Sequence, residues 1–222
     1  MQWNKAEGMG APPLSPPDGR ETVASRLTQY GEGARSRWKP FFERAGIAYP
    51  PQKTLLLGLK AEKQLQIYAS SGDNGWRLIR SLPIQKASGK IGPKLQMGDY
   101  QVPEGFYTVE SLNPNSRFHL SLRVSYPSSE DRAEAERDGR QNLGGDIMIH
   151  GSNQSVGCLA MGDEGAEDLF VLAADTTASP IEVWLCPLDF REKEVPADAN
   201  RPNWVSARYD KLKAALGQLP FD

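Results

Sequence analysis

The sequence has few of the residues from which disulfide frameworks and metal centres are built. Its 222 residues include two cysteines and two histidines. Two cysteines allow one disulfide at most, and these four side chains would need several carboxylates beside them to make a four-ligand zinc site. We therefore expect a mechanism without a metal.

Long apolar runs, a strong net charge and a phosphate-binding loop are missing as well. No apolar stretch reaches the roughly 18 residues of a membrane span. A net charge of -2 provides no field that would attract nucleic acid or an anionic membrane. Gly89 and Lys90 do not form a phosphate loop, because Ile84 stands where the first glycine belongs and Ile91 follows the lysine. We expect no cofactor, no nucleic-acid partner and no membrane span.

Cys158 is the one cysteine around which a nucleophilic site can be built. Ile147 and Ile149 alternate with Met148 and His150, which predicts a short strand with an imidazole at its end. Backbone rich in glycine follows and leads to the thiol. The order is that of a general base, a tight loop and a nucleophile.

A thiol attacks carbonyl groups as its thiolate, and an imidazole within hydrogen-bond reach is the usual base. His150 would serve Cys158 in this way. Gly157 has no side chain, so the N–H groups of Gly157 and Cys158 can face the oxyanion that develops during acyl transfer. From the spacing alone, a buried cysteine that merely follows a histidine is an equally good interpretation.

Cys186 has a different setting. It ends the alternating run 181–186, just before a proline, which predicts a half-buried strand and a thiol in the core. A disulfide to Cys158 would block the proposed nucleophile. We therefore expect two free thiols.

The wider sequence around His150 and Cys158 resembles the L,D-transpeptidase (YkuD-type) catalytic domain. The resemblance rests on His-Gly followed by Ser-x-Gly-Cys and a hydrophobic residue, and it continues through residues 98–99, 103–107, 113–123, 126–127 and 144–151. It covers roughly residues 50 to 190 and is similar to the murein L,D-transpeptidase branch, which has a short loop between the histidine and the cysteine.

The sequence departs from the commoner family pattern at two positions beside the nucleophile. Val156 replaces a histidine and Ala160 replaces an arginine. The resemblance still implies that His150 is the catalytic base and that the backbone carbonyl of Gly151 orients it. It leaves open how the substrate carboxylate is held, and whether the acyl group passes to an amine or to water.

Arg123, His119 and Ser155 are the candidate substrate-binding residues. His119 and Arg123 lie four apart on one alternating run and should face the same side of a strand, with Ser121 between them. This face would line the cleft, with Arg123 gripping a carboxylate and His119 supplying part of what the missing histidine would. The alternative interpretation is the polar outer face of a strand. Ser155 belongs to the motif that carries the resemblance.

The middle of the chain predicts an antiparallel sheet. Short apolar or alternating runs occupy residues 55–59, 65–69, 76–81, 106–109 and 118–124. Because these strands follow one another without helices, a barrel or sandwich is favoured over a doubly wound sheet. The predicted fold class is mainly β with flanking helices (α+β), a YkuD-like β-sandwich or barrel with N-terminal and C-terminal helical extensions.

The chain divides into four predicted parts. These are a flexible leader rich in proline and glycine (1–20), a helical preface (21–49), the catalytic domain (50–190), and a charged linker with a C-terminal helix (191–222). The preface should be broken near Gly31 and Pro40 and end at Gly46. Asp163 should cap a helix over 164–174, residues 130–140 read as a polar helix or loop, and Pro202 or Asn203 should open the last helix.

The resemblance implies a cysteine-dependent acyl transfer on peptidoglycan stem peptides, through a thioester acyl-enzyme, in cell-wall remodelling. One alternative is a hydrolytic amidase or carboxypeptidase of the same family that releases a D-residue or a wall-attached protein. A non-catalytic wall-binding module is an alternative of another class. The partners would be stem peptides and, in the second case, a wall-attached protein.

Such a substrate implies the periplasm or cell envelope. The chain starts without the apolar core of a signal peptide. We therefore expect that an export segment has been removed.

Overall fold

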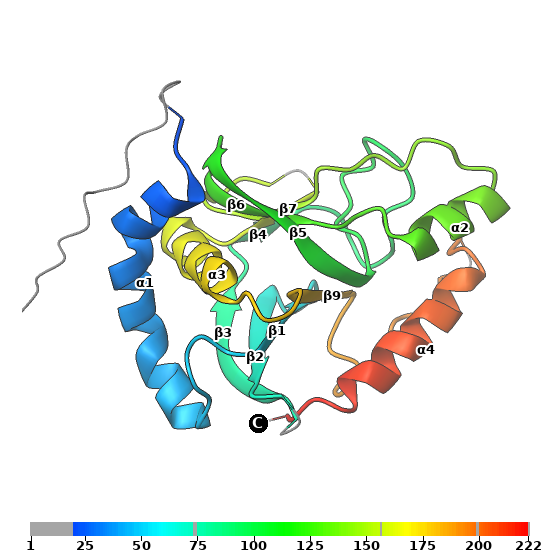
Figure 1. The fold of residues 1–222 in the computed structure, drawn as a ribbon. Helices are drawn as coiled ribbons and strands as arrows, with labels where there is room; N and C mark the ends of the chain where they lie inside the picture. The colour runs from blue at the N-terminus through cyan, green and yellow to red at the C-terminus, as the bar shows by residue number, and fades with distance from the viewer. Residues whose placement is uncertain (1–19, 73–74, 156, 199, 222) are drawn as a thin grey trace, which may run out of the picture.

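The computed structural model describes residues 20–72, 75–155, 157–198 and 200–221, and these form four helices and one mixed sheet of nine strands (Figure 1). The helices are α1 (Val23–Ala45), α2 (Ser129–Arg137), α3 (Asp163–Asp175) and α4 (Trp204–Leu216). The strands are β1 (Lys53–Leu59), β2 (Gln64–Ser70), β3 (Arg77–Pro83), β4 (Lys86–Ala87), β5 (Gly105–Ser116), β6 (His119–Val124), β7 (Met148–His150), β8 (Leu159–Ala160) and β9 (Glu182–Cys186). The predicted α+β class is confirmed, whereas residues 1–19 of the predicted leader lie outside the described residues.

The sheet consists of two halves that meet on β5. Its strand order is β3-β2-β1-β9-β5-β6-β7-β8-β4. The first residues of β5 pair with β9 and the later ones with β6, with a shift of register between Val109 and Ser111. Such a bulge bends a strand and increases its twist. Side chains from both halves share one buried cluster, including Leu56 and Ile67 from one half and Ile149 from the other.

Two of the strand pairs are parallel, which the antiparallel prediction missed. β1 pairs in parallel with β9, and β7 with β8. The second pair matters most, because the loop between its strands carries the predicted nucleophile. After this loop the chain has returned to the end of the sheet at which β7 begins. β8 therefore runs in the same direction as β7.

Helix α1 is continuous, so the predicted break near Gly31 and Pro40 is wrong. Pro40 removes one backbone donor, but it lies on the exposed side of the helix, where the carbonyl group left free is open to solvent. Trp38 and Phe42 are buried and hold the second half of the helix on the core. Gly46 ends the helix in the left-handed conformation, as predicted.

The other helices flank the two ends of the sheet. α1 and α3 lie side by side at one end in Figure 1, and α2 and α4 at the other. α3 begins at Asp163 without a side-chain cap, so the predicted capping role of Asp163 is wrong. Its carboxylate accepts instead from the N–H of Ser152 at 2.7 Å, in the loop after β7. α2 confirms a polar helix within 130–140, and α4 begins after Asn203 as predicted.

A buried ion pair fixes the segment 92–102, which is called the Lys60 loop below. The ammonium of Lys60 donates to the carbonyl oxygens of Gly92 at 3.0 Å and Val102 at 2.9 Å, and to Glu104 at 2.8 Å. The other carboxylate oxygen of Glu104 accepts from the hydroxyl of Tyr209 on α4. Both ends of the loop are thus held by one side chain, and α4 is tied to the same pair.

Candidate active site

His150 ends β7 with its imidazole almost completely buried, at 1% exposure. Its Nδ1 lies 2.6 Å from the carbonyl oxygen of Gly151, and the ring of Phe118 stacks on it with 4.8 Å between the ring centres. An Nδ1–H that donates to this carbonyl leaves Nε2 as the nitrogen that can take a proton. Burial lowers the pKa of His150, against the opposing effect of the Gly151 hydrogen bond, so the imidazole is neutral at neutral pH.

Gly151 must be glycine for this geometry to exist. A Cβ atom at this position would lie 2.6 Å from the carboxylate of Asp163, 2.7 Å from the carbonyl oxygen of Phe118 and 2.9 Å from the Cβ atom of His119. Two of these neighbours are backbone or the first atom of a side chain and cannot move aside cheaply. The backbone therefore turns directly after the imidazole, and the carbonyl that holds the ring stays in place.

The register of β7 and β8 places Cys158 and His150 on the same face of the sheet. Ile149 pairs with Leu159 and His150 with Ala160, so Cys158, one residue before β8, lies opposite Met148. Alternate residues of a strand share a face, and diagonal neighbours on adjacent strands are within reach of each other's side chains. The predicted base and nucleophile are thus diagonal neighbours on one face of two adjacent strands, although a loop separates them in the sequence.

The sulfur of Cys158 lies against the backbone before β7. It accepts from the N–H of Met148 at 3.4 Å and donates to the carbonyl oxygen of Asp146 at 3.5 Å. Burial is the largest cause that raises the pKa of this thiol, and the charge of Asp146 adds to it, whereas Met148 and the ammonium of Lys94 act in the opposite direction. The thiol and the imidazole are therefore both neutral at rest.

The two predicted oxyanion donors already have acceptors. The N–H of Gly157, which has a φ of 85°, donates to the hydroxyl of Ser88 at 2.5 Å. The N–H of Cys158 donates to the hydroxyl of Ser155 at 3.1 Å. Ser88 donates in turn to the carbonyl oxygen of Tyr100 at 2.8 Å. A substrate oxyanion would replace these hydroxyl groups, so the role of Gly157 and Cys158 as oxyanion donors stays a prediction.

Ser88 is a contact of the site that the sequence did not reveal. It precedes Gly157 by 69 positions and belongs to no motif. The position of Ser88 follows from the sheet pairing. β4 runs antiparallel to β8, with Ala87 opposite Leu159. Extending that register by one residue sets Ser88 beside Cys158.

The predicted substrate-binding residues have protein partners. The Nε2 atom of His119 lies 3.0 Å from the carboxylate of Glu167 on α3, and its φ of 73° interrupts the regular alternation of the strand. The guanidinium of Arg123 donates to Glu110 at 2.7 Å and also to Asp146. The hydroxyl of Ser155 serves Cys158 through both its N–H and its carbonyl group.

The polar face of β6 also carries Ser121, which pairs with His150 across the sheet. Its hydroxyl is buried and has no hydrogen-bond partner among the described residues. Val156, the position of the missing family histidine, lies outside the described residues. Both thiols are free, and Cys186 is fully buried in the core as predicted.

A family comparison identifies the domain. A model of the YkuD family, the L,D-transpeptidase catalytic domain, matches residues 52–183, which is more than half of the chain. The chain belongs to this family. The proteins named YafK in Escherichia coli strains K12 and O157:H7, candidate L,D-transpeptidases by name, are 37% identical over 113 residues. This match covers 50% of the chain and 43% of YafK, so the chain spans less than half the length of these relatives.

Two solved structures also match this L,D-transpeptidase-family chain, at low identity. The helical cell shape determining protein Pgp2 of Campylobacter jejuni gives a TM-score of 0.49 at 21% identity, over 72% of this chain and 57% of Pgp2. L,D-transpeptidase 1 of Mycobacterium tuberculosis gives 0.35 at 14% identity, over 60% and 62%. In the described part of the chain, none of the helices combines the length and apolar character needed to cross a bilayer.

Proposed function

We propose that this chain is a cysteine acyltransferase that acts on peptidoglycan stem peptides, with Cys158 as the nucleophile and His150 as the general base. The observation that carries the proposal is the parallel pairing of β7 with β8, which sets the thiol and the imidazole on one face. The hydrogen bond from His150 Nδ1 to Gly151 supports it, because Nε2 is then the basic nitrogen.

In the proposed reaction, Nε2 of His150 takes the proton of the thiol while the sulfur attacks the carbonyl carbon of a diaminopimelate-type residue. The N–H groups of Gly157 and Cys158 bind the resulting oxyanion in place of the two serine hydroxyls. The protonated imidazole then gives its proton to the departing amine as the carbon–nitrogen bond breaks. A D-amino acid leaves, and a thioester remains on Cys158.

The second half of the reaction returns the thiol. An amine from another stem peptide or from a protein lysine attacks the thioester in transpeptidation, and water attacks it in hydrolysis. With a wall substrate, the site of action is the periplasm or cell envelope. The proposed substrate contacts of Arg123, His119 and Ser155 stay predictions, because each of these side chains is engaged by a protein group.

Mass spectrometry of the intact protein after mixing with a tetrapeptide donor tests this proposal. The expected result is an adduct with the mass of the acyl group, lost in Cys158→Ala and kept in Cys186→Ala. The products then separate transpeptidation, which gives a joined peptide, from hydrolysis, which gives a tripeptide. Binding of the peptide without any adduct or product would leave the wall-binding module as the function instead.

A further inference from the structure

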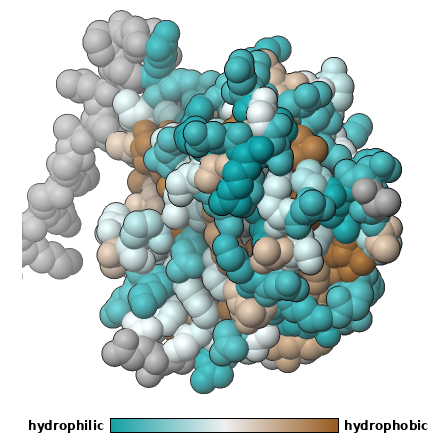
Figure 2. Space-filling model, turned by 90° about the vertical axis from the view of Figure 1, so that its right-hand side faces the viewer, coloured by the Kyte–Doolittle hydropathy of each residue, from teal (hydrophilic) through white to brown (hydrophobic). Residues whose placement is uncertain are grey.

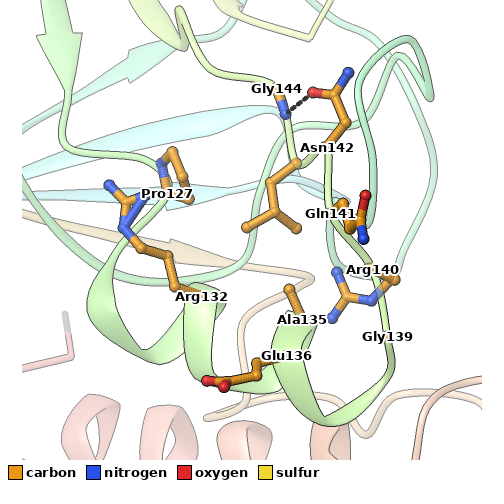
Figure 3. A pocket seen from close by; sticks show the side chains of 10 residues that line it. Pro127, Arg132, Ala135, Glu136, Gly139, Arg140, Gln141, Asn142 and Gly144 are labelled. Atoms are coloured by element: carbon orange, nitrogen blue, oxygen red, sulfur yellow. Dashed lines mark hydrogen bonds between the residues drawn. The ribbon is translucent and has the colours of Figure 1, made fainter.

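Two neighbouring cavities flank helix α2. One has a volume of 570 Å³ and lies between α2 and the segment that follows it (Figure 3). The other, of 520 Å³, lies between the N-terminal end of α2 and strands β5 and β6. Both are lined by Pro127, Arg132 and Gly144, and the two are called the α2 groove below. Figure 2, which views the molecule from the side of α2 and α4, shows a mainly hydrophilic surface with small apolar patches.

The α2 groove contains three guanidinium groups, of which two are neutralised by the protein. Arg123 donates to Glu110 and Asp146. Arg140 donates to Asp138 at 2.9 Å and to the carbonyl oxygen of Leu95.

The third guanidinium, that of Arg132, has neither a hydrogen bond nor an ion pair to any residue in the described ranges. In Figure 3 it extends from α2 toward Pro127, at the point where the two cavities meet. Arg132 is therefore the cation that is free to bind a ligand.

The groove lies close to the nucleophile. Gly144 and Gly145 form part of its wall. Asp146 follows them directly, and its carbonyl oxygen is 3.5 Å from the sulfur of Cys158. Because consecutive Cα atoms are about 3.8 Å apart, the wall at Gly145 lies within roughly 10 Å of the sulfur. One extended side chain of a bound peptide can therefore reach from the sulfur of Cys158 to the wall of the groove at Gly145.

We propose that the α2 groove is the donor-carboxylate subsite, in which Arg132 recognises the side-chain carboxylate of the residue whose carbonyl Cys158 attacks. This inference rests on the proposed function. A diaminopimelate-type residue carries a second carboxylate at the far end of its side chain, several bonds from the reacting carbonyl. A guanidinium binds a carboxylate through two parallel hydrogen bonds, which fixes direction as well as charge. Arg123 is already paired with two carboxylates of the protein.

Kinetics on two matched donors test the subsite. One is the tetrapeptide, and the other is the same peptide with the diaminopimelate side-chain carboxylate converted to an amide. The wild-type protein should prefer the free carboxylate in kcat/KM by about tenfold to a hundredfold, as expected for a charge-assisted hydrogen bond. Arg132→Ala should lose that preference, and Arg132→Lys should keep part of it.

Two variants serve as controls for this experiment. Arg137→Ala removes the same charge from the same helix, but Arg137 lines neither cavity and pairs with Glu134, so its donor preference should equal that of the wild type. Lys86→Ala removes a cation from β4, opposite Ala160 on β8. Loss of the preference in Lys86→Ala together with an unchanged preference in Arg132→Ala would overturn the subsite.

A binding measurement separates failure of the subsite from failure of the proposed function. In Cys158→Ala, titration with the tetrapeptide should shift the amide resonances of Gly144 and Gly145, and Arg132→Ala in the same background should abolish the shifts. A wild-type protein that shows these shifts but forms no thioester would overturn the proposed function and keep the subsite. A thioester without the shifts, or with shifts that do not depend on Arg132, would overturn the subsite alone.

Discussion

The two thiols of this chain lie in the two halves of the sheet and differ in exposure and in backbone setting. Cys186 ends β9 at 0% exposure, and burial raises its pKa well above that of an ordinary thiol. Cys158 follows Gly157, whose φ is positive, and its side chain is partly exposed to solvent. The side chains are the same, so the difference comes from the backbone. The thiol at the end of β9 lies in the core, whereas the thiol that follows the turn at Gly157 is partly exposed.

The largest difference between the two thiols is expected when each is removed in turn. Cys158→Ala should abolish product formation and leave the fold intact, because the smaller side chain removes the nucleophile without adding bulk. Cys186→Ala should keep turnover and lose stability, by roughly 1 kcal/mol or more, since point mutations centre near that value and a core site lies at the upper side. Turnover with the tetrapeptide and thermal unfolding of both variants provide the check. A Cys158→Ala protein that still forms product would exclude the thiol mechanism.

Alkylation compares the two thiols within one molecule. Iodoacetamide reaches Cys186 only when the fold opens, which costs several kcal/mol, so Cys158 should react at least about a thousandfold faster. Its rate should rise with pH and continue to rise above the pH at which an ordinary thiol levels off, since burial raises the pKa of Cys158. Peptide mapping after brief labelling at several pH values measures both effects. Equal labelling of the two cysteines would contradict the comparison.

The smallest effect on turnover is expected for Gly151→Ala. This change tests the position of the backbone turn after β7 and leaves the side chains of His150 and Cys158 unchanged. The new Cβ atom would meet the carbonyl oxygen of Phe118 at 2.7 Å, so the turn must shift and the imidazole of His150 with it. A displacement of about 1 Å costs on the order of a hundredfold in rate. We expect this loss in kcat while Cys158 is still alkylated. Gly33→Ala, at an exposed position of α1, is the matched control and should behave as wild type.

The sequence predicted the parts of the molecule that depend on local pattern. The alternation around Ile149 located β7 and its terminal His150, and apolar runs located the strands of the first half-sheet. The contact of His150 with the Gly151 carbonyl, which the family resemblance implied, is also present, and it joins adjacent residues. The break predicted in α1 was wrong because the tertiary packing of Trp38 and Phe42 outweighs the missing hydrogen bond at Pro40.

Contacts between distant parts of the chain could not be predicted in the same way. Ser88 reaches Gly157 only because β4 and β8 pair, and no local pattern reports that pairing. The carboxylates that hold Arg123 come from β5 and from the segment before β7. The same holds for Arg132, since a cavity is a property of the assembled elements and a single arginine on a polar helix carries no signal of its own.

The hydrogen bonds of Lys60 restrict the Lys60 loop much as a covalent cross-link between its two ends would. By joining Gly92 to Val102 they close a ring of chain, and closing a ring restricts the conformations open to everything inside it. The ring includes Tyr100, whose carbonyl oxygen holds Ser88 against the N–H of Gly157. This restraint depends on the charge and hydrogen bonds of one buried ammonium group, so a reductant cannot open it.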